Sequence, residues 1–328
     1  MSLRGRNKAL SANARLFDLN AADRDVALDA VSIDNISDQQ LLWIDLTGDD
    51  AELEPVAQHL GWPEALRQMV PGTTPEVRTW GDSFMVRVIA SRHEGSLTFN
   101  GIVLTIVAGS NYVVSIHADP IQFIDELRER EVGNSDLGVL SADSFVASLL
   151  DWHLGTYFDA VSDFEAADER LETTILDDTH DHCLQTLRAL RKAASRLRRM
   201  LSAHRGVFSA LARPDFRPSA ERESNEHFLT LDTHFQRALD AVEGTREIVI
   251  GSFELFSNQT ALRTNDVVRV LTFVTVLIGV LAVVAGVLGM NFEAPIFKTG
   301  MTGLTMAMVG MVVIAAVGAA VAKWRDWI

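Results

Sequence analysis

A stripe of polar and small residues runs along one apolar stretch near the end of the 328-residue chain. Its members recur every seven residues: Asn265, Thr272, Gly279 and Gly286. Residues seven apart share one face of a helix. Such a face allows close packing between helices, or it lines a narrow wettable path when several helices surround an axis. The pore interpretation accounts better for Asn265 and Thr272, because amide and hydroxyl groups that face lipid are penalised.

A second cluster with metal-binding chemistry lies in the middle of the chain. Its candidate zinc ligands are Asp178, His180, His182 and Cys183. Imidazole, thiolate and carboxylate groups suit Zn²⁺, but a structural zinc site needs a closed tetrahedral set. No second cluster completes such a set, so a polar turn in solvent is the interpretation that we favour.

Thr272, Gly279 and Gly286 of this stripe lie in the first of two apolar segments, residues 267–289 and residues 301–322, and Asn265 lies just before it. Each is about as long as the ~20 residues that a helix needs to cross a bilayer. The short segment between them, residues 290–300, holds Glu293 and Lys298. A soluble helical hairpin of this length keeps a polar stripe along both helices. The pattern therefore predicts two transmembrane helices joined by an external loop.

Charge is divided unevenly along the sequence. The whole chain carries 29 Lys and Arg against 44 Asp and Glu, for a net charge of −15. Residues 1–266 account for −17 and the remainder for +2. This distribution argues against a disordered chain and against a nucleic-acid binder with a basic face.

The basic residues near the spans predict their orientation. Arg263 and Arg269 flank the first span, and Lys323 and Arg325 follow the second. Lys and Arg are enriched in cytoplasmic flanks, and the first residues lack the apolar run of a signal peptide. We therefore expect both termini in the cytoplasm, with residues 323–328 as a basic cytoplasmic tail.

The first 135 residues predict an α/β domain. Strand-like runs cover residues 41–46, 83–90, 101–107 and 112–117, and helical runs cover residues 52–60, 63–69 and 121–130. The domain shows no Gly-rich phosphate loop and no clustered Ser, His and Asp. An enzyme is therefore not expected, nor is a covalent cofactor.

Residues 136–216 predict a helical hairpin with two charged arms. An acidic helix runs from Asp143 to about Ile175, and a basic helix covers residues 184–212. Arms of opposite charge are expected to attract each other, although exposed pairs contribute typically under ~1 kcal/mol each.

Residues 217–266 predict a stalk helix that continues into the first span. Apolar residues recur there at alternating spacings of three and four, as a packed seam requires. One monomer is too small to bury so long a seam, and the pattern therefore predicts a bundle of copies.

The tripeptide Gly289-Met290-Asn291 ends the first span. At this place, after a very long helix and before a short loop and a second span, it resembles the signature of the CorA family of divalent-cation channels. Residues 264–272 also look like the stalk-to-pore junction of that family. The resemblance covers the whole architecture. It implies a funnel-shaped homopentamer in the cell inner membrane, in which an α/β (or α+β) cytoplasmic domain and a helical stalk precede two transmembrane helices.

The resemblance also assigns roles along the ion path. The first span would line the pore, with Gly289, Met290 and Asn291 as the selectivity residues. Val268 and Leu271 fall where the family places a hydrophobic constriction, and Asn265 would form a second polar ring. The implied partners are the bilayer, divalent cations and further copies of the chain, with no nucleic acid.

The chemistry of such a ring favours Mg²⁺. This ion holds its water tightly and prefers oxygen ligands, so neutral oxygens from Asn291 side chains and the Gly289 backbone would grip the hydrated ion. A thioether is a poor partner for a hard cation, so Met290 is expected to pack. Co²⁺ and Ni²⁺ are further candidate ions. Two alternatives stay open: a Zn²⁺ transporter of the ZntB type, whose members typically replace the motif Met, and a non-conducting oligomeric membrane scaffold.

Overall fold

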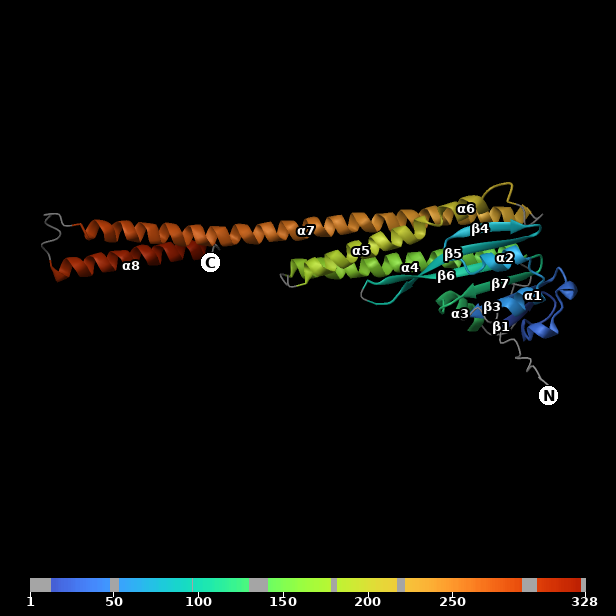
Figure 1. The fold of residues 1–328 in the computed structure, drawn as a ribbon. Coiled ribbons are helices and arrows are strands. Elements are labelled where there is room, and N and C mark those ends of the chain that lie inside the picture. The colour runs from blue at the N-terminus through green and yellow to red at the C-terminus, as the bar shows by residue number, and fades with distance from the viewer. Residues whose placement is uncertain are drawn as a thin grey trace, which may run out of the picture. The chain divides into compact units, whose positions relative to one another are not determined.

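A computed structural model describes residues 13–47, 53–95, 97–129, 141–177, 182–216, 222–290 and 300–325 (Figure 1). The chain divides into two compact units. The first unit comprises Met1–Thr174 and Thr179–Ser252, and the second comprises Ile175–Asp178 and Phe253–Ile328. One continuous helix, α7 (Arg222–Leu288), contributes to both units.

A seven-stranded sheet forms the centre of the first unit. Its strands are β1 (Asn13–Asp18), β2 (Arg24–Val26), β3 (Gln40–Thr47), β4 (Glu76–Trp80), β5 (Ser83–His93), β6 (Phe99–Ala108) and β7 (Tyr112–His117). The order is β2-β1-β3-β7-β6-β5-β4. Strands β3 and β7 are parallel, and the other neighbours are antiparallel. Two 3-10 turns, η1 (Leu28–Ala30) and η2 (Ile33–Asn35), connect β2 to β3.

The sequence predicts four of these strands, β3, β5, β6 and β7. It misses β1, β2 and β4. Strands β2 and β4 are the two edges of the sheet, where charged residues such as Arg24, Glu76 and Arg78 replace the apolar run. Edge strands commonly carry charges that discourage further pairing, so their hydrophobic signal is weak.

The two faces of the sheet pack against different helices. On one face, Leu42 and Ile44 join a core with Val56 of α1 (Leu53–His59) and Leu66 of α2 (Glu64–Met69). On the other face, the ring of Trp43 lies 6.1 Å from that of Phe145 in α4 (Ala142–Leu176). Helix α3 (Gln122–Glu129) follows β7. The first unit is therefore a sheet with helices on both faces, as layered domains require.

Helices α4 and α7 run in parallel along the first unit. Three polar contacts join them: His227 to Ser144 at 3.2 Å, His234 to Asp151 at 2.6 Å, and Ser252 to Asp168 at 2.7 Å. The two residues of each contact are 83 or 84 positions apart in the sequence. The two helices therefore keep the same register along their length. Burial raises the pKa of Asp168, although the Ser252 hydroxyl that donates to it acts in the opposite direction.

The predicted basic helix over residues 184–212 is interrupted, and the expectation of one helix is wrong. The structure has α5 (Cys183–Ser202) and α6 (Arg205–Leu211). The break lies at His204, which is fully buried. Its Nε2 accepts the Ile89 backbone N–H at 2.7 Å, and its Nδ1 lies 3.2 Å from the Leu201 carbonyl oxygen. Side-chain bonds of this kind compete with continuation of a helix.

The predicted attraction between the acidic and basic arms is not realised as ion pairs. Among the described residues, no basic side chain of α5 lies within 4.0 Å of a carboxylate of α4. Helix α5 instead buries an apolar face that includes Leu187, Leu190 and Leu197, which turns its charges toward solvent. A pocket of about 590 Å³ also lies between the two arms.

A buried arginine ties α2 to the sheet. Arg87 on β5 is 1% exposed. Its guanidinium donates to the carbonyl oxygens of Met69 and of Thr74, the latter at 3.2 Å, and to the Thr105 hydroxyl at 3.3 Å. A side chain at Gly72 would place its Cβ 2.4 Å from Nη1 of Arg87. Several hydrogen bonds hold the guanidinium in place, so it can move away from an added Cβ only if some of these bonds break.

Replacing Gly72 with alanine is expected to destabilise the first unit by about 1–3 kcal/mol, because overpacking displaces the Arg87 guanidinium. The apparent Tm in detergent should fall by about 5 °C. Gly155→Ala in α4 is the matched control, because a Cβ there meets no atom within 4 Å and alanine favours a helix. Equal melting temperatures for the two variants would contradict the role of Gly72.

The second unit contains the last part of α7 and α8 (Met301–Trp324). Both helices are long and apolar enough to cross a membrane, with mean hydropathies of 2.8 and 2.4 in their most apolar windows. The most apolar stretch of each helix contains no buried residue. In this unit α8 contacts α7 through Gly318, where an added Cβ would lie 3.0 Å from Leu277 Cδ1.

Candidate functional site

Helix α7 carries the whole seven-residue stripe on one face in the second unit. Asn265, Thr272, Gly279 and Gly286 are all exposed. At about 100° per residue, this face lies roughly 120–180° around the helix from Leu277, which contacts α8. A Cβ added at Gly279 or Gly286 would meet no atom within 4 Å. Among the described residues, the stripe therefore has no packing partner.

The small-residue packing that explains such glycines is present on α8 instead. Its buried or half-buried residues recur mostly every four positions: Gly303, Ala307, Met311, Ala315, Gly318 and Ala322. Small residues let two helices approach closely in a bilayer. The α7–α8 contact therefore uses the glycines and alanines of α8, and Gly279 and Gly286 of α7 take no part in it.

The two polar members of the stripe differ in their hydrogen bonding. The Thr272 hydroxyl donates to the Val268 carbonyl oxygen of the same helix at 2.7 Å. This bond lowers the penalty for Thr272 in an apolar environment, so Thr272 is weaker evidence for a water-filled path than the sequence indicates. The Asn265 amide makes no hydrogen bond within the described part of the chain. The next residue, Asp266, forms an ion pair with Arg269 in which the charged atoms are 3.3 Å apart.

The predicted constriction residues are also uncovered on α7. Val268 is 51% exposed and Leu271 is 63% exposed. Val268 lies about 40–60° around the helix from Asn265 and Thr272, and Leu271 lies about 100° from Thr272. Val268 therefore borders the polar stripe directly, whereas Leu271 flanks it.

Two of the three motif residues fall within the described chain. Helix α7 ends at Leu288, and the Gly289 N–H donates to the Ala285 carbonyl oxygen at 2.9 Å. The Met290 N–H donates to the Val287 carbonyl oxygen at 3.2 Å, and the Met290 side chain is 48% exposed. Asn291 lies outside the described residues, so its role stays a prediction.

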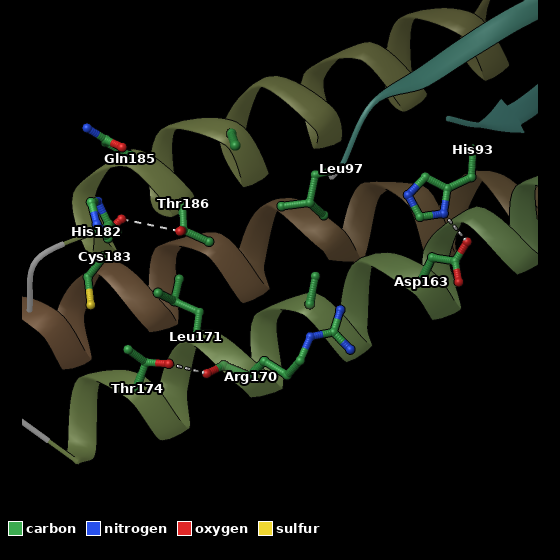
Figure 2. Close-up of a pocket in the computed structure, with 12 residues that line it drawn as sticks. His93, Leu97, Asp163, Arg170, Leu171, Thr174, His182, Cys183, Gln185 and Thr186 are labelled. Atoms are coloured by element: carbon green, nitrogen blue, oxygen red, sulfur yellow. Dashed lines mark hydrogen bonds and ion pairs between the residues drawn. The ribbon is translucent and has the colours of Figure 1, made fainter. Parts of the chain in front are cut away.

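The candidate zinc ligands are only partly described. Asp178 and His180 lie outside the described residues, His182 is exposed, and Cys183 is buried in the apolar face of α5. Figure 2 shows His182 and Cys183 at one end of the pocket between α4 and α5, with His93 and Asp163 together at the other end. Within the described ranges, no three His, Cys, Asp or Glu side chains are grouped to hold a metal. The zinc set therefore stays a prediction.

The sequence also misses a buried cluster of Ser, His and Asp in the first unit. Asp45 on β3 accepts hydrogen bonds from Ser115 at 2.6 Å and from His117 at 3.1 Å, and the Trp43 indole donates to the Ser115 hydroxyl at 3.0 Å. All four side chains are at most 2% exposed. The parallel pairing of β3 with β7 assembles them, and nothing local in the sequence indicates that pairing.

This cluster is structural rather than catalytic. A serine nucleophile needs its hydroxyl bonded to a histidine base and open to substrate, whereas the Ser115 hydroxyl donates to Asp45 and is buried. Burial alone lowers the pKa of His117, but the hydrogen bond and charge of Asp45 outweigh it and raise that pKa. The protonated ring is thus favoured beside the carboxylate, as a structural ion pair requires.

Comparison with known proteins agrees with this architecture. The family model described as CorA-like Mg²⁺ transporter protein matches residues 38–322, which is most of the chain. The cobalt/magnesium transport protein CorA of Thermotoga maritima is 27% identical over 228 residues, which cover 69% of this chain and 64% of that protein. The protein of the same name from Methanocaldococcus jannaschii is 24% identical over 320 residues, which cover 94% of this chain and 98% of that protein.

Solved structures show the same fold. The complete structure of the CorA magnesium transporter from M. jannaschii matches with a TM-score of 0.72 at 22% identity, over 96% of this chain and 99% of that one. The structure of the full-length CmaX protein matches with a TM-score of 0.70 at 19% identity, over 98% of this chain and 99% of that one. The family model, which matches most of the chain, shows that the chain belongs to the CorA family of divalent cation transporters and is not an enzyme.

Proposed function

We propose that the protein is a homopentameric channel that passes Mg²⁺, and also Co²⁺ and Ni²⁺, across the cell inner membrane. The observation that carries this proposal is the stripe on α7, which faces away from α8 and has no packing partner in the part of its own protomer that the structure describes. Copies of α7 around an axis place Asn265, Thr272, Gly279 and Gly286 along one path.

A path of this kind suits a cation that keeps its water. The glycines expose backbone and leave room beside the helix, and the Asn265 side chain supplies an amide that makes no hydrogen bond to the described residues of its own protomer. Asn291, Met290 and Gly289 form the outer mouth, where neutral oxygens bind the water shell of the ion without holding it long. Val268 and Leu271 narrow the path between the polar rings.

The names of the relatives support the choice of ion. The relatives from T. maritima and M. jannaschii are both called cobalt/magnesium transport proteins. Met290 agrees with this choice, because zinc-transporting members of the family typically replace the methionine of the motif. The alternatives are Zn²⁺ transport and a membrane scaffold that conducts no ion.

The orientation follows from the charges that flank the spans. Arg263 and Arg269 on α7, with Lys323 and Arg325 at the end of α8, support a cytoplasmic location for this end of both spans. Both termini and the first unit are then cytoplasmic. The net charge of −17 on residues 1–266 favours cations near the inner mouth.

Ion flux into proteoliposomes tests the function. Purified oligomers of verified size are reconstituted, and uptake of Mg²⁺, Co²⁺ and Zn²⁺ is followed with ion-selective dyes, with and without a pH gradient. We expect Mg²⁺ and Co²⁺ flux above that of protein-free vesicles, independent of the pH gradient. Zn²⁺ flux that exceeds Mg²⁺ flux and follows the pH gradient would assign the zinc alternative. No flux of any ion would favour the scaffold.

A further inference from the structure

A basic stripe covers the exposed side of α5 in the first unit. Four exposed side chains share this side of the helix: Arg188, Arg191, Lys192 and Arg199. Their spacings of three, four and seven or eight residues place them as neighbours along one face. Within the described part of the chain, none of these four side chains has an ion-pair or hydrogen-bond partner. Arg198 beside them lies 3.6 Å from Glu243 of α7.

Helix α4 presents a complementary acidic stripe. Glu165 and Glu169 are exposed and Glu172 is half-buried, and at about 100° per residue these three carboxylates lie within about 60° of one another around the helix. All three lack an ion-pair partner among the residues that the structure describes. At 1.5 Å per residue, Glu165 to Glu172 spans about 10 Å and Arg188 to Arg199 spans about 17 Å. The two stripes are therefore opposite in sign, and the acidic stripe fits within the length of the basic one.

The two stripes do not satisfy each other within one chain. The apolar face of α5 is turned inward, and the pocket between α4 and α5 is lined mainly by other residues, including Arg170, Leu171, Gln185 and Thr186. The two stripes carry opposite charges but lie apart on one protomer. Charges arranged in this way can pair when two copies of the chain meet. Such a contact joins two different surfaces, and it generates a ring when the rotation closes.

We propose that the basic stripe of α5 docks on the acidic stripe of α4 in a second copy of this chain. This inference rests on the oligomeric channel proposed above and names a surface by which its cytoplasmic parts associate. Exposed ion pairs contribute up to about 1 kcal/mol each and are screened by salt. The contact therefore orients neighbouring copies and depends on salt.

A second copy suits the basic stripe better than a nucleic acid or an anionic lipid surface. The net charge of −17 on residues 1–266 repels phosphate-rich surfaces as they approach. The α4 stripe of a second copy provides three carboxylates, which fit within the length of the basic stripe. Complementary charges of this kind also suppress wrong orientations.

Cysteine cross-linking of the full-length oligomer tests the contact. The native Cys183 is 1% exposed, so Glu169→Cys combined with Arg191→Cys provides the reactive pair. Mild oxidation, or bridging with a short bismaleimide, is expected to give a covalent ladder from dimer to the complete ring, because each copy offers both halves. The single variants Glu169→Cys and Arg191→Cys are controls that should stay monomeric on a denaturing gel. Verified oligomers of the paired variant that give no ladder would overturn the inference.

Charge reversal with rescue separates this contact from a general loss of structure. In the paired cysteine variant, Arg188→Glu with Arg199→Glu is expected to lower the ladder yield about tenfold, because attraction becomes repulsion. Adding Glu165→Arg and Glu172→Arg should restore it, and raising the salt concentration should weaken the ladder of the parent pair. A reversal that leaves the yield unchanged, or a loss that the compensating pair does not restore, would contradict the docking.

The remaining outcomes are separable. If Arg191→Cys is protected from maleimide by phosphatidylglycerol vesicles and not by phosphatidylcholine vesicles, and no ladder forms, the stripe binds an anionic lipid surface and the inference is wrong. Mg²⁺ flux without a ladder overturns the inference and leaves the channel intact. A ladder without flux supports the contact and contradicts the channel.

Discussion

Replacing Asn291 with alanine is expected to reduce Mg²⁺ flux in proteoliposomes by about 100-fold, with the oligomer intact. The proposed ring loses its side-chain carbonyl oxygens, and the loss of even three net hydrogen bonds of about 1 kcal/mol each to the water shell corresponds to about two powers of ten. Backbone oxygens such as that of Gly289 remain in this variant. Flux is measured under the same gradient as for the unaltered protein, after size-exclusion chromatography has verified the assembly.

Two neighbouring variants make this result specific. Asn291→Gln keeps an amide at a longer reach, and it should retain more flux than the alanine variant. Met290→Leu removes a thioether that is a poor ligand for a hard cation and preserves its volume, so its flux should stay close to that of the unaltered protein. Unchanged flux in Asn291→Ala, or an equal loss in Met290→Leu, would show that the Asn291 side chain does not select the ion.

Acid is expected to destabilise the first unit, and two buried histidines contribute to this loss. His153 and His204 are each 0% exposed, and their ring centroids lie 5.1 Å apart. Burial lowers the pKa of His204 to about 4, and it lowers that of His153 well below its ordinary value, with the charge of His204 adding to the effect. Below pH 6.5 the unfolded chain binds protons that the folded chain refuses, so stability falls as the pH falls.

The expected size of this effect is large for a single pair of residues. With a pKa of about 4 in the folded state and about 6.5 in the unfolded state, His204 alone costs about 2 kcal/mol at pH 5. The loss begins near pH 6.5 and continues until the folded-state pKa is passed. Thermal unfolding of the detergent-solubilised protein between pH 7.5 and pH 4.5 measures it as a falling apparent Tm.

A variant at His153 isolates its share of the acid effect. Neither ring nitrogen of His153 has a hydrogen-bond partner among the described residues, and the ring packs against Tyr157, His204 and Phe208. His153→Phe keeps an aromatic ring and removes the titration, so its Tm should depend less on pH. The pH slope is the readout, which makes the result independent of any change in packing at neutral pH. The same slope in both proteins would contradict a role for His153.

Local pattern in the sequence accounts for much of the fold. The central strands carry continuous apolar runs, and the two spans are long stretches with almost no charged residues. Short segments of the sequence are therefore enough to predict β3, β5, β6, β7 and α8. The seven-residue stripe is likewise visible in the sequence, because α7 is one uninterrupted helix and its period fixes which residues share a face. The edge strands β2 and β4 are missed because charged residues weaken the same signal.

Pairings between distant segments account for the rest. The sequence places Asp45 and His117 72 residues apart, and only the parallel pairing of β3 with β7 brings them together. The break between α5 and α6 depends on a bond from His204 to the backbone of Ile89, 115 residues away. No local window contains such information, since burial and hydrogen bonding are set by the partner that the topology supplies.

The same distinction between local pattern and distant contacts applies to the proposed channel site. The sequence alone determined that Asn265, Thr272, Gly279 and Gly286 share one face, because helical periodicity is local. Only the tertiary structure decided that this face is turned away from α8, and that the small residues of α8 make the contact between the two helices. It also decided that α4 and α5 form no ion pair with each other among the described residues, because α5 packs through its apolar face instead. The physical reason is that packing selects which face of each helix is buried, and that choice depends on neighbours far away in the chain.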